Sequence, residues 1–355
     1  CALSLATPAA MLSAAGALAR RGVLVRRLQA FEVLARIDTV VFDKTGTLTR
    51  DRLVLSQVLV RPGLAPAQAL QQAAPLASAS LHPVSRAIAR AAQEQDLALP
   101  AFNEVQELPG LGLQAGQGDS LLKLGSARFC GLDEAGLLGA GQAVEGQPCC
   151  YLVDASGWLA TFVLDEGVRE EAAAVVAQLQ ALGLETRLLS GDQTQAAERV
   201  ARQLGITQVV AQASPERKLA EVLALQQQGH RLAMVGDGLN DGPVLAGADV
   251  SFALGQALPL AQSKADFVFM ASNLKPLAAT LKLSHKTMQI VRQNMMWAAI
   301  YNFSCVPLAM LGYLPAWLAG LGMACSSLGV VLNAMRLSKT LQFEAEVEIE
   351  NVEKA

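Results

Sequence analysis

Two neighbouring stretches of the sequence, residues 295–313 and 315–335, contain no charged side chain. Each is long enough to cross a lipid bilayer as a helix. Residues 1–19 are also free of charge and rich in Ala and Leu. Backbone polar groups within lipid must be hydrogen-bonded inside the segment, so such stretches are restricted to helices. We expect residues 1–19 to be the end of one transmembrane helix and the other two stretches to be two more.

Basic residues flank these stretches and predict their orientation. The cytoplasmic side of a membrane protein carries an excess of Lys and Arg. The basic residues that follow residues 1–19, precede residue 295 and follow residue 335 are Arg20, Arg21, Arg26, Arg27, Lys282, Lys286, Arg292, Arg336 and Lys339. We therefore expect both flanks of the helical pair to be cytoplasmic, the link around Gly312–Pro315 to lie outside, and residues 336–355 to form a cytoplasmic tail.

The overall composition is that of a mixed chain with membrane and soluble parts. Hydrophobic residues make up 52% of the 355 residues and charged residues 17%, which excludes intrinsic disorder as the main architecture. A formal net charge of −3 gives no reason to expect a nucleic-acid partner. Six Cys without regular spacing do not indicate a disulfide framework. Because residue 1 is Cys rather than Met, we expect the chain to be the C-terminal part of a longer protein.

Strand and helix patterns alternate through residues 36–285. Short apolar runs typical of buried strands alternate with helical stretches that end at Gly, which predicts an α/β fold with a doubly wound parallel sheet. The expected strands are 37–42, 185–189, 231–235, 250–253 and 267–270, and the expected helices are 168–182, 193–204 and 215–228. Residues 52–162 have mixed patterns and predict an α+β domain inserted after the first strand, which leaves 36–51 and 163–285 for the sheet domain.

The segment that best predicts chemistry is residues 43–49, Asp-Lys-Thr-Gly-Thr-Leu-Thr. Asp43 directly follows an apolar strand, at the sheet edge where α/β proteins bind ligands. A carboxylate in this position can attack phosphorus and form an aspartyl phosphate. Thr47 and nearby backbone N–H groups are expected to hold the phosphoryl oxygens, and Gly46 allows the backbone to curl around them.

Three further segments end strands or begin helices where they could reach the same ligand. Asp237 and Asp241, in Gly-Asp-Gly-Leu-Asn-Asp, are oxygen ligands suited to Mg²⁺, with Asp43 as a third. The metal neutralises charge on a transferring phosphoryl group. A hydroxyl and a backbone N–H of Ser190-Gly191-Asp192 can bind phosphate oxygens, and Lys218 can supply a positive charge to them.

In this order, Asp43–Thr49, Ser190–Asp192, Pro215 with Lys218, and Gly236–Pro243 resemble the P-type ATPases. Within them, the sequence at Cys1–Pro8, Leu81-His82-Pro83, Tyr301-Asn302 and Met323–Ser327 is similar to heavy-metal pumps of the copper(I) type. The resemblance implies a haloacid dehalogenase-like phosphorylation domain with an inserted nucleotide-binding domain. A finer resemblance, on the proline-containing stretches around Pro307 and Pro315, is to the subgroup that serves haem–copper oxidase assembly.

The resemblance also implies roles for other residues. ATP would be held in the inserted domain by His82, Gly110, Gly112 and Gly125, with Asn240 in the phosphorylation domain; Lys44 and Thr45 belong to the phosphorylation motif. The transported Cu(I) would meet Cys1, Tyr301, Asn302, Met323 and Ser327. A thiolate is a soft ligand suited to Cu(I), and Met323 and Ser327 share a helix face.

The sequence departs from the family at some positions. Leu81 stands where Glu usually precedes His-Pro, so one adenine contact is missing or replaced. Ser190 stands where Thr is usual and keeps the hydroxyl.

We therefore expect a multi-pass protein of the cell membrane, with cytoplasmic soluble domains, that exports Cu(I) using ATP and Mg²⁺. Its partners would be membrane lipid and a metal ion, delivered by a copper chaperone. The chain would be a fragment without the actuator domain and first membrane helices. Two alternatives remain: a pump for silver, zinc or cadmium, and a soluble-type phosphohydrolase of the same fold. A zinc or cadmium pump would be expected to carry charged residues within residues 295–335, and this segment contains none. Soluble phosphohydrolases of this fold usually carry an acidic residue at the position that Thr45 occupies here.

Overall fold

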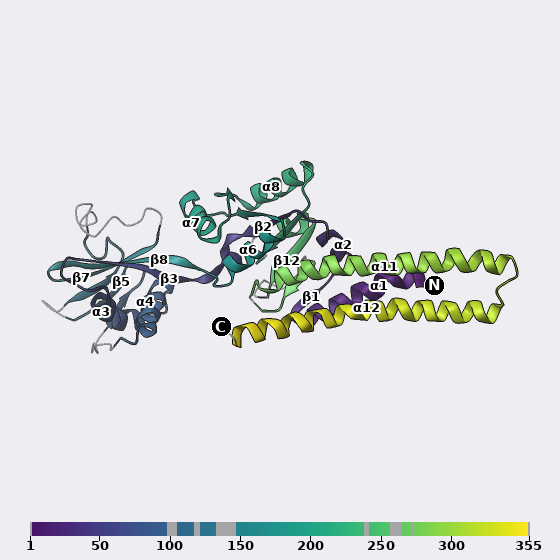
Figure 1. Ribbon diagram of the computed structural model, residues 1–355. Coiled ribbons are helices and arrows are strands. Elements are labelled where there is room, and N and C mark those ends of the chain that lie inside the picture. Colours follow the sequence, from purple (N-terminus) through teal and green to yellow (C-terminus); the bar gives the residue numbers. More distant parts are fainter. Residues whose placement is uncertain are drawn as a thin grey trace. The chain divides into compact units, whose positions relative to one another are not determined.

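The computed structural model describes residues 2–97, 105–116, 121–132, 147–237, 241–255, 265–271 and 273–353. The chain divides into two compact units (Figure 1). The first combines Cys1–Leu48 with Glu170–Ala355, and the second is Thr49–Arg169.

The first unit contains a seven-stranded sheet. Its order is β1 (Val23–Val25), β13 (Phe267–Phe269), β12 (Val250–Leu254), β11 (Leu232–Gly236), β2 (Thr39–Asp43), β9 (Glu185–Leu189) and β10 (Gln208–Val210). All neighbouring strands are parallel except β1, which pairs antiparallel with β13. The chain runs outward from β2 to β9 and β10, and then returns to build β11, β12 and β13 on the other side. This change of direction beside β2 is the switch point at which open α/β sheets bind ligands.

Helices connect and cover these strands, which confirms the predicted doubly wound sheet. They are α2 (Ala30–Leu34), α6 (Ala172–Ala181), α7 (Thr194–Leu204), α8 (Pro215–Gln227) and α9 (Gly242–Gly247). Local sequence explains where they begin and end. The Ser214 hydroxyl accepts a hydrogen bond from the backbone N–H of Arg217 at 3.3 Å, and Pro215 occupies the first turn of α8. Helix α7 ends at Gly205 in the left-handed conformation.

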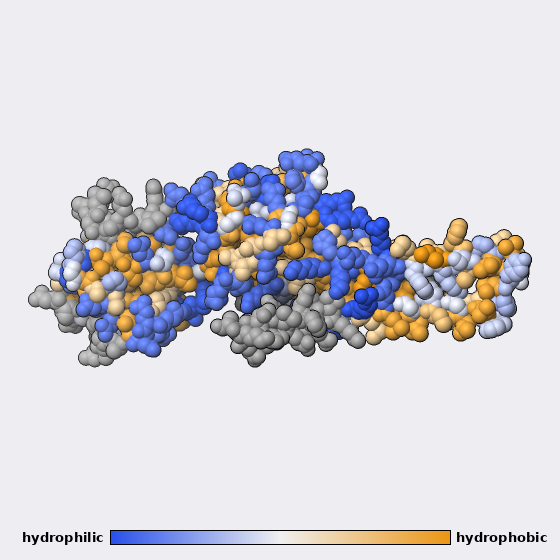
Figure 2. Space-filling view, viewed as in Figure 1, coloured by the Kyte–Doolittle hydropathy of each residue, from blue (hydrophilic) through white to orange (hydrophobic). Residues whose placement is uncertain are grey.

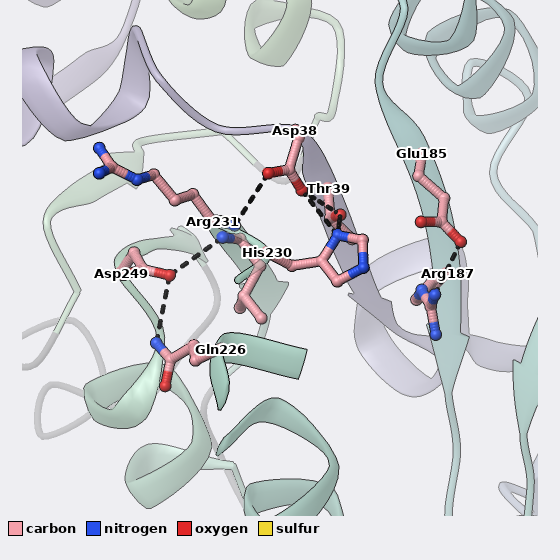
Figure 3. Close-up of polar contacts among 9 residues, drawn as sticks. Asp38, Thr39, Glu185, Arg187, Gln226, His230, Arg231 and Asp249 are labelled. Carbon is pink, nitrogen blue, oxygen red and sulfur yellow. Dashed lines mark hydrogen bonds and ion pairs between the residues drawn. The ribbon is translucent and has the colours of Figure 1, made fainter. Parts of the chain in front are cut away.

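Polar contacts join β2 and β11 at their amino ends (Figure 3). The Asp38 carboxylate accepts hydrogen bonds from the Thr39 hydroxyl at 2.6 Å and from the backbone N–H of Arg231 at 3.0 Å. It also lies 3.1 Å from Nδ1 of His230. These contacts fix the register in which Phe42 pairs with Val235 at the other end of the two strands. The residues that follow β2 and β11 are thereby held side by side.

The second unit is a six-stranded antiparallel sheet with two helices. The sheet order is β3 (Thr49–Val60), β8 (Gly157–Val168), β7 (Cys149–Asp154), β6 (Leu122–Gly125), β5 (Gly112–Ala115) and β4 (Val105–Leu108). Helices α3 (Pro66–Ser78) and α4 (Pro83–Glu94) share a buried core with the sheet, which includes Leu70, Ile88 and Phe162. The unit extends beyond the expected 52–162 because β3 and β8 pair as far as Thr49 and Val168.

Three long helices belong to the first unit: α1 (Ala2–Ala19), α11 (Pro276–Met310) and α12 (Ala316–Glu353). Helix α1 lies along both of the others, and Ala6, Ala298 and Val330 form a small buried cluster among them (Figure 1). Among the described helices, α12 alone is long and apolar enough to cross a membrane, over Trp317–Ser338. Helix α11 ends at Met310, before the end of the expected span 295–313. The spans at residues 1–19 and 295–313 stay predictions.

Large apolar side chains are exposed where α11 and α12 meet at their connecting turn. Figure 2 shows hydrophobic residues over this end of the helical pair, whereas the part near the sheet is mostly hydrophilic. The exposed side chains include Trp297, Ile300, Phe303, Trp317 and Leu321. An apolar surface of this kind is expected where a protein meets lipid or further helices.

We expect the stability of the sheet to depend on an aromatic cluster that is formed by residues of α2, β12 and β13. The Phe252 and Phe267 rings stack with centroids 4.9 Å apart, and Phe31 meets Phe267 edge to face at 5.6 Å. Phe252→Ala should lower the free energy of unfolding in detergent by about 3–5 kcal/mol, because it leaves a cavity in a fully buried cluster. The control is Met270→Ala, at an exposed position just after β13, for which we expect a loss below about 0.5 kcal/mol. Equal losses for the two variants would contradict this account.

Candidate active site

The candidate active site is built around Asp43, the last residue of β2. Its side chain is buried and its Oδ1 lies 2.6 Å from Nζ of Lys218. The same Nζ lies 2.8 Å from Oδ2 of Asp241, which is also buried. Lys218 comes from the first turn of α8, and Asp241 immediately precedes α9. One ammonium group therefore bridges two carboxylates that come from distant parts of the sequence.

A second ion pair lies in the same unit. Nζ of Lys44 is 2.8 Å from Oδ2 of Asp192, and the Ser190 hydroxyl donates to the same oxygen at 2.6 Å. Burial by itself would raise the pKa of Asp192, but the hydrogen bonds from Lys44 and Ser190 outweigh it and lower the pKa. Gly191, between them, is exposed. The predicted Ser190–Asp192 segment is thus joined directly to the residue that follows Asp43.

The electrostatics of Asp43 are set mainly by its burial. Loss of solvent raises its pKa, the Lys218 charge opposes this, and the nearby Asp241 and Asp237 carboxylates raise it further, to about 7. For Lys218, burial favours the neutral amine, but Asp43 and Asp241 outweigh burial and raise its pKa. The site has an excess of negative charge, which an added cation would relieve.

The residues present fit a magnesium ion. Oδ1 of Asp241 is buried and has no hydrogen-bond partner among the described residues. Asp43, Asp237 and Asp241 would supply the hard oxygen ligands that Mg²⁺ prefers. The described part of the chain contains no ready-made cage of three acidic, His or Cys ligands. A magnesium ion held by one or two of these carboxylates would take its remaining ligands from waters and substrate phosphates.

Gly46 lies where its loop passes close to Asp237. Its φ is +70°, and a Cβ atom built on it would lie 2.6 Å from Oδ2 of Asp237. The backbone conformation therefore favours glycine, and a larger residue would also push the Asp237 carboxylate away. In the same loop, Thr47 is fully buried and Thr45 is exposed.

The second unit contains a cavity of about 240 Å³. It is lined by four of the residues expected to bind nucleotide, namely His82, Gly110, Gly112 and Gly125. Gly112 and Gly125 are paired across β5 and β6, and the Phe129 ring covers both. A Cβ on Gly112 would lie 2.7 Å from that ring and one on Gly125 2.8 Å. The glycines predicted from their order in the sequence thus share one wall. The fifth expected residue, Asn240, lies outside the described residues.

The sequence did not predict four of the other residues that line this cavity. These residues are Ser80 and Glu107, and Cys149 and Cys150 at the start of β7. No spacing in the sequence predicts that Ser80 and Glu107 meet, because their contact depends on how the segment between α3 and α4 lies against β4. Leu81 is 87% exposed and is not among the residues that line the cavity.

The residues expected to contact a transported metal lie on α11 and α12. The Tyr301 hydroxyl donates to the carbonyl of Ala319 at 3.1 Å, close to Gly322. Asn302 and Ser327 are half-buried, and Met323 is exposed. Cys1 lies outside the described residues. The structure therefore places Tyr301 and Asn302 on α11 and Met323 and Ser327 on α12, the two helices of one pair.

The raised pKa of Asp43 predicts how stability depends on pH without divalent cations or nucleotide. The folded chain holds a proton on Asp43 up to about pH 7. The unfolded chain releases it near pH 4. The contribution of Asp43 to the free energy of unfolding is therefore fully present below pH 4 and is lost as the pH rises to 7. Asp43→Asn imitates the protonated acid, so its free energy of unfolding should rise relative to that of the unsubstituted chain by about 2 kcal/mol between pH 5 and pH 7.

Urea unfolding in detergent at several pH values measures this difference. The control is Asp96→Asn, because Asp96 is exposed and lies in the second unit. The difference in free energy of unfolding between Asp96→Asn and the unsubstituted chain should not change with pH. A constant difference for Asp43→Asn would show that Asp43 is ionised throughout.

Gly46→Ala should weaken binding of a divalent cation about tenfold, because the new methyl group displaces the Asp237 carboxylate. Binding of Mn²⁺, followed by electron paramagnetic resonance, measures the affinity. The matched control is Gly183→Ala, at a positive φ of 82° with no atom within 4 Å of the added Cβ. If the two variants bind Mn²⁺ equally well, the proximity of Gly46 to Asp237 has no role in metal binding.

Comparison with known proteins identifies the family of the chain. Residues 37–249 match the model of the haloacid dehalogenase-like hydrolases. The chain is 38% identical over 347 residues to a probable copper-exporting P-type ATPase V of Mycobacterium tuberculosis, covering 96% of this chain and 45% of that protein. It is 34% identical over 344 residues to a copper-exporting P-type ATPase of Bacillus subtilis, covering 96% and 43%. The chain thus spans less than half the length of these relatives.

The fold is also similar to a solved structure, a zinc-transporting PIB-type ATPase in the E2.Pi state. The TM-score is 0.85 and the identity 32%, over 95% of this chain and 56% of that one. The resemblance to heavy-metal P-type ATPases seen in the sequence is therefore confirmed, and the chain belongs to the haloacid dehalogenase-like hydrolase family.

Proposed function

We propose that this chain is the catalytic part of a pump that moves Cu(I) out of the cytoplasm by hydrolysing ATP through an aspartyl phosphate on Asp43. The observation that carries the proposal is the setting of Asp43: a buried carboxylate at the switch point of the sheet, held by Lys218 beside Asp241. A purely structural aspartate gains nothing from burial beside two further carboxylates, because each of them raises the free energy of the ionised form.

In the proposed reaction, an oxygen of Asp43 attacks the γ-phosphorus of ATP. A bond forms between that oxygen and phosphorus, the bond from phosphorus to the bridging oxygen breaks, and ADP leaves with the electron pair. Lys218 holds Asp43 in position and offsets negative charge as the bond forms. Asp43, Asp237 and Asp241 would hold the Mg²⁺ that neutralises charge on the phosphoryl oxygens.

Residues beside Asp43 complete this arrangement. Lys44 holds Asp192, and with it the Ser190–Asp192 segment, next to the attacking residue. Thr45 is exposed and provides no acid or base, so water attack on the aspartyl phosphate is slow unless another group assists. A long-lived phosphorylated aspartate suits a pump, because the helices must rearrange before the phosphate is lost.

The proposed cargo rests on similarity and on side-chain chemistry. Several relatives that cover 95–96% of this chain are named as copper exporters or copper transporters. Cys1, Met323 and the polar groups of Tyr301, Asn302 and Ser327 would contact the ion, and sulfur ligands suit Cu(I). A zinc pump is the second candidate, since the similar solved structure transports zinc. The absence of charged side chains from residues 295–335 favours copper.

The proposal also places the protein in the cell membrane, with the seven-stranded sheet of the first unit and the whole second unit in the cytoplasm and lipid around the apolar ends of α11 and α12. The apolar stretch Trp317–Ser338 and the exposed residues near it support this location. The metal would arrive bound to a cytoplasmic copper chaperone, since free Cu(I) binds thiolates strongly.

ATPase activity of the full-length parent protein, compared across Cu(I), Ag(I), Zn(II) and Cd(II), tests the function. We expect stimulation by Cu(I) and Ag(I), which prefer sulfur ligands, and little by the divalent ions. Asp43→Asn should abolish both the activity and the acid-stable label from γ-labelled ATP, because an amide is not a nucleophile.

Asp237→Ala provides the matched comparison. It should reduce labelling and its dependence on Mg²⁺ while leaving nucleotide affinity within about twofold, because the nucleotide cavity belongs to the other unit. Labelling that survives in Asp43→Asn would exclude Asp43 as the phosphorylated residue. Stimulation by Zn(II) alone would replace copper with zinc as the cargo.

A further inference from the structure

The cavity of the second unit has one acidic side chain among the residues that line it. That residue is Glu107, on β4. Glu107 is exposed, and the cavity that it lines also contains the apolar residues Val84, Leu111 and Leu124 and the two paired glycines. In such a pocket the few polar groups determine which ligand is accepted and how it is oriented. Glu107 is therefore the strongest hydrogen-bond acceptor available to a bound base.

The Glu107 carboxylate is held in place by a buried hydroxyl. The Ser80 hydroxyl donates to Oε1 of Glu107 at 2.7 Å, and Ser80 is only 6% exposed. The same hydroxyl oxygen accepts a hydrogen bond from the backbone N–H of His82 at 3.1 Å. Ser80 thus links β4 to the start of α4, where His82 lies. A restrained carboxylate loses less conformational freedom on binding than a free surface glutamate does.

Because this contact occupies part of the acceptor capacity of Oε1, Oε2 is the oxygen of Glu107 that is more open to a ligand. A single acceptor matches a single donor, and the 6-amino group of adenine is such a donor. Guanine binds a carboxylate best through two adjacent N–H groups, which requires both oxygens. Guanine and hypoxanthine also carry a carbonyl oxygen at position 6, where a carboxylate would repel it.

We propose that Glu107 selects adenine by accepting a hydrogen bond from its 6-amino group at Oε2, and that Ser80 is the positioning residue for this contact. The inference rests on the proposed function, since it assumes that the cavity takes the base of ATP. It goes beyond that function because it names the group that distinguishes ATP from other purine triphosphates.

A double-mutant cycle between protein and ligand tests the contact. Binding is measured for the whole chain in detergent by titration calorimetry, in an Asp43→Asn background that prevents turnover. The ligands are ATP and purine riboside triphosphate, which lacks only the 6-amino group. With Glu107 present, loss of the amino group should weaken binding about tenfold, as expected for a partly exposed hydrogen bond to a charged group. In Glu107→Ala the two ligands should bind within about twofold of each other.

The matched control is Glu94→Ala, because Glu94 is exposed, lies in the same unit and is not among the cavity residues. It should keep the tenfold preference for ATP. Ser80→Ala should reduce the preference to about threefold while changing the affinity for purine riboside triphosphate little, which a general loss of folding would not do.

Two results would overturn the inference while leaving the proposed function intact. One is a tenfold preference for ATP that persists in Glu107→Ala, and the other is tighter binding of GTP than of ATP by the unsubstituted cavity. If neither ATP nor purine riboside triphosphate binds before Glu107 is changed, both the inference and the proposed nucleotide function are wrong.

Discussion

The ammonium group of Lys218 stands between two buried carboxylates, and the arrangement of the active site depends on it. Asp43 and Asp241 are both almost inaccessible to solvent, and Lys218 contacts each of them within 2.8 Å. Without this charge, two adjacent carboxylates in a poorly solvated setting could not both be ionised. Each of the three residues comes from a different element, so the ion pair also holds β2, α8 and the start of α9 together. Even with Lys218 in place, Asp43 has a pKa raised to about 7. The site is thus prepared for an additional cation.

In the proposed function, the two units separate the chemistry from recognition of the base. The first unit contains the carboxylate proposed to react and the acidic residues that suit Mg²⁺. The second unit contains a cavity lined by glycines and by Glu107. The second unit is inserted directly after the Lys44–Leu48 loop, and the chain returns to the first unit at Glu170. Nucleotide binding and phosphoryl transfer can therefore be altered separately by substitution.

Much of the first unit could be predicted from sequence because its strands are short, apolar and followed by polar residues. The runs before Asp43 and Asp237 predicted two strands, and the strand order of the structure places these strands next to each other. The termini of α7 and α8 followed from Gly205 and from Ser214 with Pro215. Strand β5 begins at Gly112, for which the resemblance implied a role in holding ATP but no strand. Contacts such as Ser80 with Glu107 depend on tertiary packing, and no local pattern encodes them. The sequence also could not show that Lys218 bridges Asp43 and Asp241, because spacing places a lysine near a site without specifying its partners.

The central claim is that Asp43 becomes phosphorylated by ATP. Borohydride cleaves an acyl phosphate reductively, and it converts a phosphorylated aspartate into homoserine. The full-length protein, treated with ATP and Mg²⁺ and then with borohydride, can be digested and sequenced by tandem mass spectrometry. The account predicts homoserine at position 43 and unchanged aspartate at positions 192, 237 and 241. Homoserine at any of those three positions, or none at position 43 when ATP is hydrolysed, would contradict it.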